Sequence, residues 1–331
     1  MRTIVIGASG FVGRNIMKAI SRESDVIGTQ NSGKDSALMK YDMSKDSFKE
    51  KFGKYFWDHQ EIMEHGNKFY GIIAAAIRQM EQVQDSSAEK LNIDKTIDLI
   101  NDMVELKIKP VFISTSYVYE GVHEKYVETD KINPQSEYAR QKSVVEKYLM
   151  ENVKDYLIYR IDKIVDEFPK GDHLFNQWYD SIKKGDPIKC IKDQYFSPIF
   201  VQDVANAVAI GCKLDLSGIY NLSNNQPIYR AELARKFLHH MKRNDVPIIE
   251  GTLEELNLSS RPLRTNIDSS KFLRDVHKKG GEFKFTSMDE VMENFAGHVD
   301  SMRKYQQGHY INSPKNSEPA NLSIDGKIEE K

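Results

Sequence analysis

The chain has 331 residues, of which 40% are hydrophobic and 29% charged, a balance typical of a globular protein with a sizeable core. Its formal net charge of −2 argues against a basic nucleic-acid-binding surface, and we expect neither a targeting segment nor a membrane span. Cys190 and Cys212 give no disulfide framework or metal-ligand spacing, and the nine histidines are scattered. We therefore expect no metal site, and a reducing, cytoplasmic setting.

The first motif is a glycine-rich turn, Gly7-Ala8-Ser9-Gly10-Phe11-Val12-Gly13, which follows the apolar run Thr3–Ile6. An apolar-periodic stretch begins at Phe11, so the order is strand, tight turn and helix. A helix N-terminus presents unpaired N–H groups and the positive end of its dipole, which together bind a pyrophosphate. Such a turn also fits an ordinary strand-to-helix connection, so the prediction of a dinucleotide site depends on a second motif.

Apolar segments alternate with helical patterns as far as about residue 165. The strand candidates are Thr3–Ile6, Val26–Thr29, Gly71–Ala76, Pro110–Ser114 and Tyr156–Ile161. The helical patterns are Phe11–Ser21, Asp46–Phe56, Ser87–Leu106 and Glu137–Glu151. This alternation predicts parallel βαβ units with right-handed crossovers, and hence an α/β fold with a Rossmann-like doubly wound parallel sheet.

The pattern changes after residue 165. Helices are expected at Leu174–Lys184, Gln202–Lys213, Arg230–Lys242 and from Ser287 to about Tyr305, with short strands at Ile188–Ile191, Phe196–Phe200 and Gly218–Leu222. We expect residues 1–165 to form the dinucleotide-binding domain, to which residues 196–213 return. Residues 166–305 should mainly form a smaller C-terminal α/β substrate-binding domain, and the polar residues 306–331 a disordered tail.

The candidate catalytic residues surround the end of the strand at Pro110–Ser114, where Ser114, Thr115 and Ser116 supply hydroxyl groups. Ligands bind at the carboxyl ends of strands in open parallel sheets. Tyr138 and Lys142 are four residues apart on a helix and share one face, where an ammonium group lowers the pKa of a phenol and suits it to general acid–base catalysis. A hydroxyl from the strand end would hold a substrate carbonyl.

Asn92 on the preceding helix would anchor a water or a backbone carbonyl that relays protons. The Tyr-x-x-x-Lys spacing is common by chance, and each of these residues alone has an ordinary structural explanation. The combination with the glycine turn, in the right order along one sheet, favours catalysis.

With these motifs the chain resembles the extended short-chain dehydrogenase/reductase family, and within it the dTDP-4-dehydrorhamnose reductases, from residue 1 to about 300. The similar segments are Gly7–Gly13, Ser114–Gly121 with Tyr126, Glu128, Asp130 and Pro134, the pair Tyr138 and Lys142, Phe196–Ala205, and Ser260-Arg261-Pro262 with Asn266-Ile267-Asp268.

The resemblance implies that Thr115, Tyr138 and Lys142 form a catalytic triad and that Arg261 faces the diphosphate of a nucleotide sugar, since the arginine fork pairs with phosphate. At two positions that concern substrate binding, the chain departs from the family's usual sequence. Ser116 stands where the family usually has Asp, and Lys163 occupies a position that normally contacts the sugar. We expect Ser116, Tyr117, Lys163 and Arg261 to bind a hexose that differs from the family's, such as one with a carboxylate or another hydrogen-bonding group.

We expect the cofactor to be NADP(H) rather than NAD(H). The second strand ends without the acidic residue that binds the ribose hydroxyls of NAD, while Arg14 and Lys34 would pair with a 2′-phosphate. Asp42 and Met43 resemble the family's adenine-contacting pair. The residues expected at the cofactor are Gly7, Ser9, Gly10, Phe11, Val12, Gly13, Arg14, Lys34, Asp42, Met43, Ala74, Ala75, Ala76, Asn92, Tyr138 and Lys142.

The favoured function is reduction of a keto group on a nucleotide-activated deoxysugar, with Tyr138 as the proton donor. A nucleotide-sugar epimerase with bound NAD stays open, as does a non-catalytic regulatory subunit of the kind found in methionine adenosyltransferase β subunits. A 4,6-dehydratase is disfavoured because Ser116 and Tyr117 replace the Asp-Glu pair that this chemistry needs. The expected partner is the nucleotide sugar, with neither nucleic acid nor membrane, and a homodimer is compatible with the family.

Overall fold

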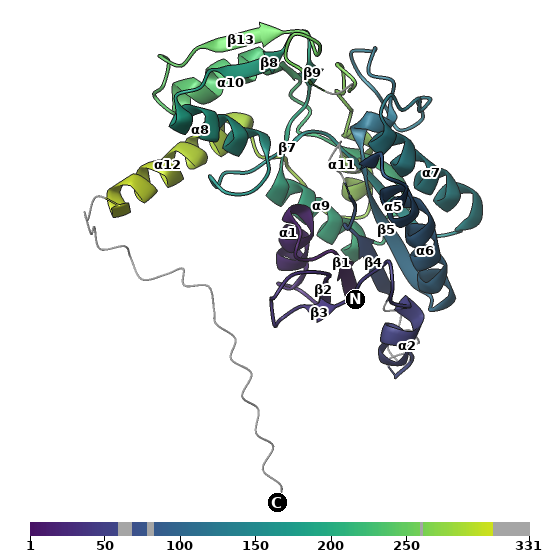
Figure 1. Ribbon diagram of the computed structural model, residues 1–331. Helices are drawn as coiled ribbons and strands as arrows, with labels where there is room; N and C mark the ends of the chain where they lie inside the picture. Colours follow the sequence, from purple (N-terminus) through teal and green to yellow (C-terminus); the bar gives the residue numbers. More distant parts are fainter. Residues whose placement is uncertain (59–67, 78–82, 259–260, 307–331) are drawn as a thin grey trace, which may run out of the picture.

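The computed structural model describes residues 1–58, 68–77, 83–258 and 261–306 (Figure 1). The tail expected to be disordered falls almost entirely at 307–331, outside the described residues. No helix of the described part is long and apolar enough to cross a lipid bilayer.

A seven-stranded sheet with the order β11-β6-β5-β4-β1-β2-β3 forms the centre of the larger lobe. Its strands are β1 (Arg2–Ile6), β2 (Asp25–Gln30), β3 (Met39–Lys40), β4 (Phe69–Ile73), β5 (Ile108–Thr115), β6 (Leu157–Ile161) and β11 (Gly218–Leu222). Every neighbouring pair is parallel, which confirms the predicted doubly wound sheet. The order reverses at β1, so a crevice for ligands is expected at the carboxyl ends of β1 and β4.

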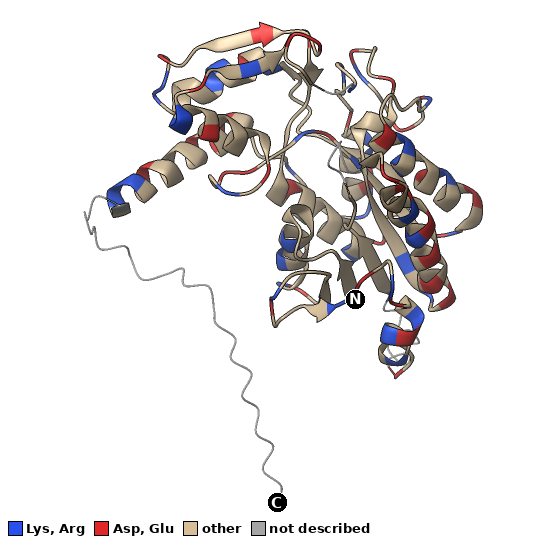
Figure 2. Cartoon of the chain, viewed as in Figure 1, with Lys and Arg blue, Asp and Glu red and all other residues tan. Residues whose placement is uncertain are grey.

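Helices cover both faces of this sheet, as parallel sheets require. Every residue of β4 and β6 is buried. One face packs against α1 (Phe11–Ile20), α9 (Val201–Lys213) and α11 (Ser270–Lys278), the other against α2 (Phe48–Asp58), α6 (Thr96–Glu105) and α7 (Glu137–Asn152). Acidic residues lie along α6 and residues of both signs along α7, whereas the strands between the helices carry few charged residues (Figure 2).

The helix predicted over Ser87–Leu106 is interrupted. The chain forms α5 (Ser86–Glu89), a π-helical segment η1 (Lys90–Lys95) and then α6. Within the π-helical segment the amide of Asn92 bonds to both backbone groups of Ile77, with 2.8 Å from Nδ2 to the carbonyl oxygen and 2.9 Å from the Ile77 nitrogen to Oδ1. Such segments are often found at functional sites.

A smaller lobe lies above the carboxyl ends of the strands (Figure 1). It contains β7 (Ile164–Val165), α8 (Leu174–Lys184), β8 (Ile188–Ile191), β9 (Tyr195–Phe196), β10 (Ile199–Phe200), β12 (Ile228–Tyr229), α10 (Arg230–His240), β13 (Ile248–Gly251) and α12 (Met288–Gln306). Its core is aromatic, because Phe175 and Trp178 of α8 pack against Phe237 of α10 and Phe295 of α12.

The predicted strand over Phe196–Phe200 is wrong as a single element. Ser197 and Pro198 separate β9 from β10, since the Ser197 N–H donates to Asp162 Oδ2 at 2.7 Å and Pro198 has no N–H for a ladder. The short elements β12 and β13, and helix α11, were not predicted.

The glycine turn brings β1 and α1 close together. Gly7 has a φ of +84°, in the left-handed region that favours glycine, and its N–H donates to Thr29 Oγ1 at 3.1 Å. A Cβ added to Gly13 would lie 2.2 Å from the carbonyl oxygen of Gly7. The start of α1 can therefore pack on the end of β1 only with glycine at position 13.

We expect Gly13→Ala to destabilise the protein by about 1–3 kcal/mol, because the added methyl group meets backbone atoms that have no room to move. The matched control is Gly297→Ala in α12, where an added Cβ meets nothing within 4 Å. That change should be neutral or stabilising, since alanine is the better helix former. Urea unfolding curves measure both. Equal effects of the two substitutions would contradict the close approach at Gly13.

Candidate active site

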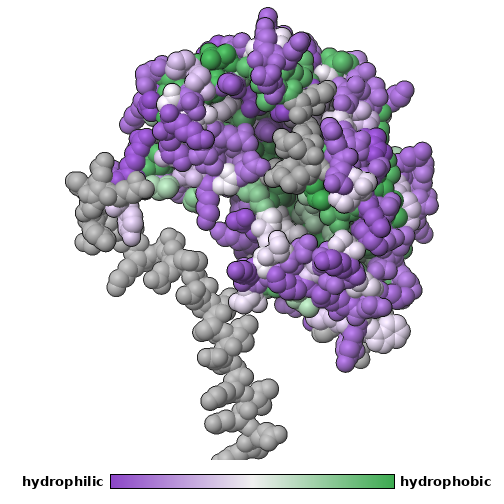
Figure 3. Space-filling view, viewed as in Figure 1, coloured by the Kyte–Doolittle hydropathy of each residue, from purple (hydrophilic) through white to green (hydrophobic). Residues whose placement is uncertain are grey.

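A cavity of about 570 Å³ opens at the carboxyl ends of the strands and is bounded by residues of both lobes. Figure 3 shows hydrophobic residues around the hollow between the two lobes. Hydrophilic residues cover most of the rest of the surface in this view. Most of the predicted site residues line the cavity: Gly7, Ser9, Gly10, Phe11, Val12, Asp42, Met43, Ala74, Ala75, Ala76, Thr115, Ser116, Tyr117, Tyr138, Lys142, Lys163 and Arg261. One cavity thus brings together residues that are far apart in the sequence.

Gly13, Arg14, Lys34 and Asn92 are not part of this lining. Gly13 lies buried behind the turn, and the Arg14 guanidinium donates to the carbonyl oxygens of Ser9 at 3.3 Å and Gly10 at 3.4 Å. Lys34 is exposed on the loop after β2. Asn92 lies one layer behind the cavity and fixes the wall segment that ends at Ile77, with a further bond of 2.8 Å to Gln141 Oε1. Arg14 and Asn92 thus act on the cavity wall through the backbone of Ser9, Gly10 and Ile77, which line it.

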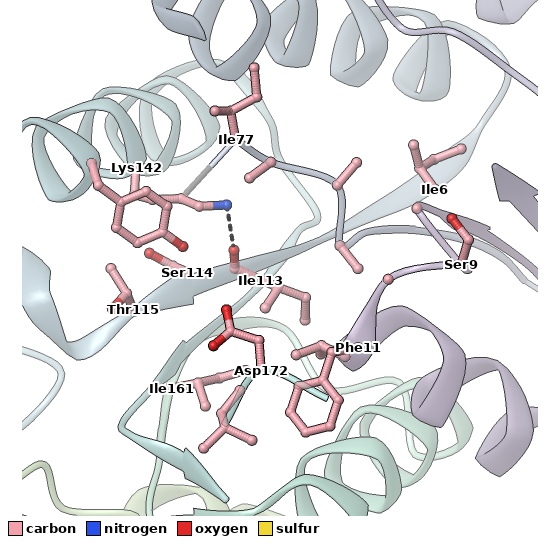
Figure 4. A pocket seen from close by; sticks show the side chains of 18 of the residues that line it. Ile6, Ser9, Phe11, Ile77, Ile113, Ser114, Thr115, Lys142, Ile161 and Asp172 are labelled. Carbon is pink, nitrogen blue, oxygen red and sulfur yellow. Dashed lines mark hydrogen bonds between the residues drawn. The ribbon is translucent and has the colours of Figure 1, made fainter. Parts of the chain in front are cut away.

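Helix α7 positions Tyr138 and Lys142. Ser136 caps the helix, with its Oγ 3.4 Å from the Ala139 nitrogen, so Tyr138 lies in the first turn and Lys142 one turn later on the same face. Lys142 Nζ donates to the carbonyl oxygen of Ile113 at 2.9 Å, the bond drawn in Figure 4, and lies 5.9 Å from the centroid of the Tyr138 ring. Burial lowers the pKa of Lys142 to about 8, although Glu146 opposes this.

Thr115 is the last residue of β5 and the cap of the short helix η2 (Ser116–Val118). Its Oγ1 accepts a hydrogen bond from the Tyr117 nitrogen at 3.3 Å. In Figure 4, Thr115, Ser114 and Lys142 surround the same part of the cavity. A hydroxyl, a phenol and an ammonium group are thus brought to one place by β5 and α7.

A buried ion pair supports this arrangement. Glu146, one turn after Lys142 on α7, accepts from Arg160 Nη2 of β6 at 2.7 Å and also from the hydroxyl of Ser114. Both charged side chains are almost fully buried, and Arg160 also donates to the hydroxyl of Tyr119 at 2.8 Å. The sequence analysis did not find this pair, because nothing in the local pattern around either residue indicates the other.

A second buried carboxylate, Asp162, forms part of the cavity wall next to Lys163 in the sequence. Its Oδ1 accepts from the hydroxyls of Ser116 and Thr265, each at 3.0 Å, and its Oδ2 from the Ser197 nitrogen. Burial raises the pKa of Asp162 to about 7 against these hydrogen bonds, which lower it. Asp162 therefore joins three separate segments, those that contain Ser116, Ser197 and Thr265.

The smaller lobe contributes residues that the sequence did not indicate: Asp172, His173 and Gln177. The His173 ring stacks on Phe11, with centroids 5.6 Å apart and planes at 11°. Asp172 accepts from Gln177 Nε2 at 2.9 Å, and its carboxylate points into the space between Thr115 and Phe11 (Figure 4). These contacts close the cavity over the start of α1.

Polar residues at the end of β2 and directly after it also line the cavity: Thr29, Asn31 and Ser32. Asp42 lies beside them, and hydrogen bonds from Ser44 lower the pKa of its carboxyl. None of the cavity residues at the end of β2 is acidic. Across the described ranges, no cluster of three or more His, Cys, Asp and Glu side chains is placed to hold a metal ion.

A parallel sheet with a glycine turn after β1, and with hydroxyl, tyrosine and lysine groups at the end of β5, defines an extended short-chain dehydrogenase/reductase fold. The model of the RmlD substrate binding domain family matches residues 1–295. The chain therefore belongs to this family.

Among curated relatives, the chain is 23% identical over 244 residues to methionine adenosyltransferase 2 subunit beta of Bos taurus, covering 70% of each chain. It is 24% identical over 180 residues to dTDP-4-dehydrorhamnose reductase of Salmonella typhimurium, covering 50% of this chain and 58% of the relative.

Two similar solved structures are a dTDP-4-dehydrorhamnose reductase from Bacillus anthracis in complex with NADP and a UDP-N-acetylglucosamine 4-epimerase from Methanobrevibacter ruminantium. The first has 22% identity and a TM-score of 0.70, covering 89% and 98% of the two chains. The second has 17% identity and a TM-score of 0.71, covering 91% and 98%. At these identities the structures establish the fold.

The raised pKa of Asp162 should make the free energy of unfolding depend on pH. Its folded-state pKa of about 7 lies above that of an unfolded aspartate, so the folded protein retains a proton that the unfolded chain has released. This contribution to stability is present at low pH and is lost as pH rises toward about 7. The free energy of unfolding of wild type, minus that of Asp162→Asn, should fall by about 2–3 kcal/mol between pH 5 and pH 8.

Asparagine suits this site because its amide can donate to the two hydroxyls while its oxygen accepts the Ser197 N–H. Asp300→Asn on the surface of α12 is the control and should show no such pH dependence. A difference that stays constant from pH 5 to pH 8 would mean that Asp162 is ionised throughout.

Proposed function

We propose that this protein reduces a keto group on a nucleotide-activated deoxysugar with a nicotinamide dinucleotide, and that NADPH is preferred. The observation that carries the proposal is the single cavity that holds the glycine turn at one end, Thr115, Tyr138 and Lys142 in the middle, and Arg261 at the other. Membership in the RmlD family supports the substrate class.

The residues present fit a dinucleotide. The start of α1 directs backbone N–H groups toward the cavity, and the small side chains of Ala74, Ala75 and Ala76 form the wall opposite. When bound, the nicotinamide would supply the hydride. A Cβ at Gly7 would lie 2.9 Å from backbone atoms of Ala75, so the turn can pack against this wall only with glycine.

The protein's own groups would manage the proton and the developing charge. Thr115 would hold the keto oxygen and Tyr138 would donate the proton to the alkoxide as it forms. Lys142, fixed on the carbonyl of Ile113, would favour the phenolate that remains and so make Tyr138 a better acid. Arg261 would bind the diphosphate of the substrate, and Lys163 and Tyr117 would contact the sugar.

The preference for NADPH is supported by Gln30, Asn31 and Ser32 at the end of β2, which offer no carboxylate to a ribose and no repulsion to a 2′-phosphate. Arg14 in the first turn of α1 and Lys34 on the following loop are the cations we assign to that phosphate. The Bacillus anthracis relative binds NADP.

Two other functions share this fold. An epimerase would oxidise and re-reduce one carbon with NAD that stays bound, and an epimerase is among the similar structures. A regulatory role is favoured by one observation, the similarity to methionine adenosyltransferase 2 subunit beta over 70% of the chain. NADPH consumption with a panel of nucleotide-4-ketosugars separates the reductase from both, whereas NAD retained through purification would favour the epimerase.

Tyr138→Phe should lower turnover of the reactive ketosugar about 10²–10⁴-fold, because it removes the general acid while keeping the ring. Cofactor binding and melting temperature should stay as in wild type. The measurement is the rate of NADPH oxidation at saturating substrate.

Tyr148→Phe on the same helix is the matched control, since its hydroxyl bonds to Asn101 on the outside of the protein. It should keep full activity. A folded Tyr138→Phe protein with wild-type turnover would refute the assignment of Tyr138.

Replacement of both Arg14 and Lys34 by alanine should weaken NADPH binding about tenfold or more and leave NADH binding almost unchanged. The reason is the loss of charge-assisted contacts to the 2′-phosphate, each worth about 1.5–3 kcal/mol. Titration of nucleotide fluorescence measures both affinities, and Lys18→Ala in the last turn of α1 is the control. If the ratio of NADPH affinity to NADH affinity does not change, Arg14 and Lys34 do not bind the 2′-phosphate. The proposal of a reductase would be unaffected by that result.

A further inference from the structure

Asp172 reaches the cavity from the smaller lobe, next to the start of α1. The residues on both sides of it lie beside the Phe11 ring: His173 stacks on this ring, with centroids 5.6 Å apart, and a Cβ added to Gly171 would lie 3.6 Å from Cδ2 of Phe11. Asp172 itself lines the cavity, and its carboxylate points into the space between Phe11 and Thr115 (Figure 4). A carboxylate of the smaller lobe therefore faces the part of the cavity that connects the glycine turn to the candidate catalytic residues.

Hydrogen bonds of the smaller lobe hold Asp172 in this place. Nδ1 of His173 accepts from the Asp166 nitrogen at 3.3 Å, and Nε2 donates to the carbonyl oxygen of Phe168 at 3.0 Å, so one buried ring fixes the segment before α8 at two backbone positions. The carboxylate of Asp172 accepts from Gln177 Nε2 at 2.9 Å. The fold alone therefore places this negative charge, before any ligand is bound.

The other charged groups beside this space make the carboxylate of Asp172 important. Lys142 and Lys163 line the same cavity, and an ammonium group repels any ligand that carries a positive charge. The neighbouring carboxylate of Asp162 is buried and accepts three hydrogen bonds from the protein. Asp172, by contrast, is exposed and faces the cavity. It can therefore offset the lysines for a ligand that acquires a positive charge.

The proposed function brings such a ligand to this space. The glycine turn would hold the pyrophosphate of the cofactor, and Thr115 and Tyr138 would hold the keto group, so the nicotinamide and its ribose must connect these two points. Reduction of the keto group takes a hydride from the ring and a proton from Tyr138, forms the C–H and O–H bonds of an alcohol, and leaves the ring with one positive charge. A nearby carboxylate attracts this oxidised ring, whereas the reduced ring is neutral.

We propose that Asp172 faces the nicotinamide ring and favours its oxidised, positively charged form over the neutral reduced form. Removal of the carboxylate would then weaken the binding of NADP⁺ more than the binding of NADPH. The same interaction would stabilise the positive charge that develops on the ring as the hydride leaves. This inference rests on the proposed function for the place of the nicotinamide, and it assigns Asp172 as a cofactor-contacting residue of the smaller lobe.

The test is calorimetric binding of NADP⁺, NADPH and 2′,5′-ADP, which carries the 2′-phosphate but no nicotinamide. Asp172→Asn retains an oxygen for Gln177 and removes the charge. It should weaken NADP⁺ binding about three- to tenfold relative to NADPH, a modest factor because solvent screens an exposed carboxylate. Binding of 2′,5′-ADP should not change, and Asp172→Glu should restore part of the loss. The readout is the ratio of the NADP⁺ and NADPH affinities, because any unfolded fraction lowers both alike.

Asp180→Asn is the matched control, because Asp180 lies on α8, pairs with Lys183 at 2.7 Å and is not among the described residues that line the cavity. It should bind all three probes as wild type does. If Asp172→Asn changes the NADP⁺ and NADPH affinities by the same factor, or changes neither, the inference is overturned while the proposed function stands. If wild type binds neither dinucleotide, both are overturned. Because no turnover is measured, a changed ratio would stand even if no ketosugar were reduced.

Discussion

The buried pair of Glu146 and Arg160 is the interaction on which the geometry of the site depends. It joins α7 to β6, and through the hydroxyl of Ser114 it joins both to β5. Breaking such a pair by removing one partner typically costs about 3–5 kcal/mol, because the remaining charge is left unpaired in a low-dielectric interior. Helix α7 is therefore held in one position along its axis, and Tyr138 and Lys142 are held with it.

The same carboxylate sets the charge balance around the candidate catalytic lysine. Lys142 is buried against the Phe112 ring, 4.4 Å from its centroid, and burial favours the neutral amine. Glu146, one turn away, acts in the opposite direction. An ammonium group can influence Tyr138 only while it carries its charge, so the carboxylate that positions the helix also helps to preserve the electrostatics that the proposed chemistry needs.

The sequence predicted the sheet well because its central strands are buried on both faces and consist mostly of apolar residues, as in β4. It also indicated Tyr138 and Lys142, whose relation is local to one helix. It could not indicate Asp162, whose hydrogen-bond partners come from segments far away in the chain. The short strand β13 was missed for another reason: it has four residues, half of them exposed, and carries no alternation that separates it from a loop.

These differences divide the site into two parts with different physical origins. The part of the cavity that we propose for hydride transfer is formed by local motifs on β1, β5 and α7, which the sequence alone indicates. The part that we propose for the substrate is formed by tertiary contacts across the two lobes, where Asp162 joins Ser116 to Thr265 and Ser197. It follows that membership in the family constrains the type of reaction, whereas the identity of the sugar depends on charges that only the folded chain brings together.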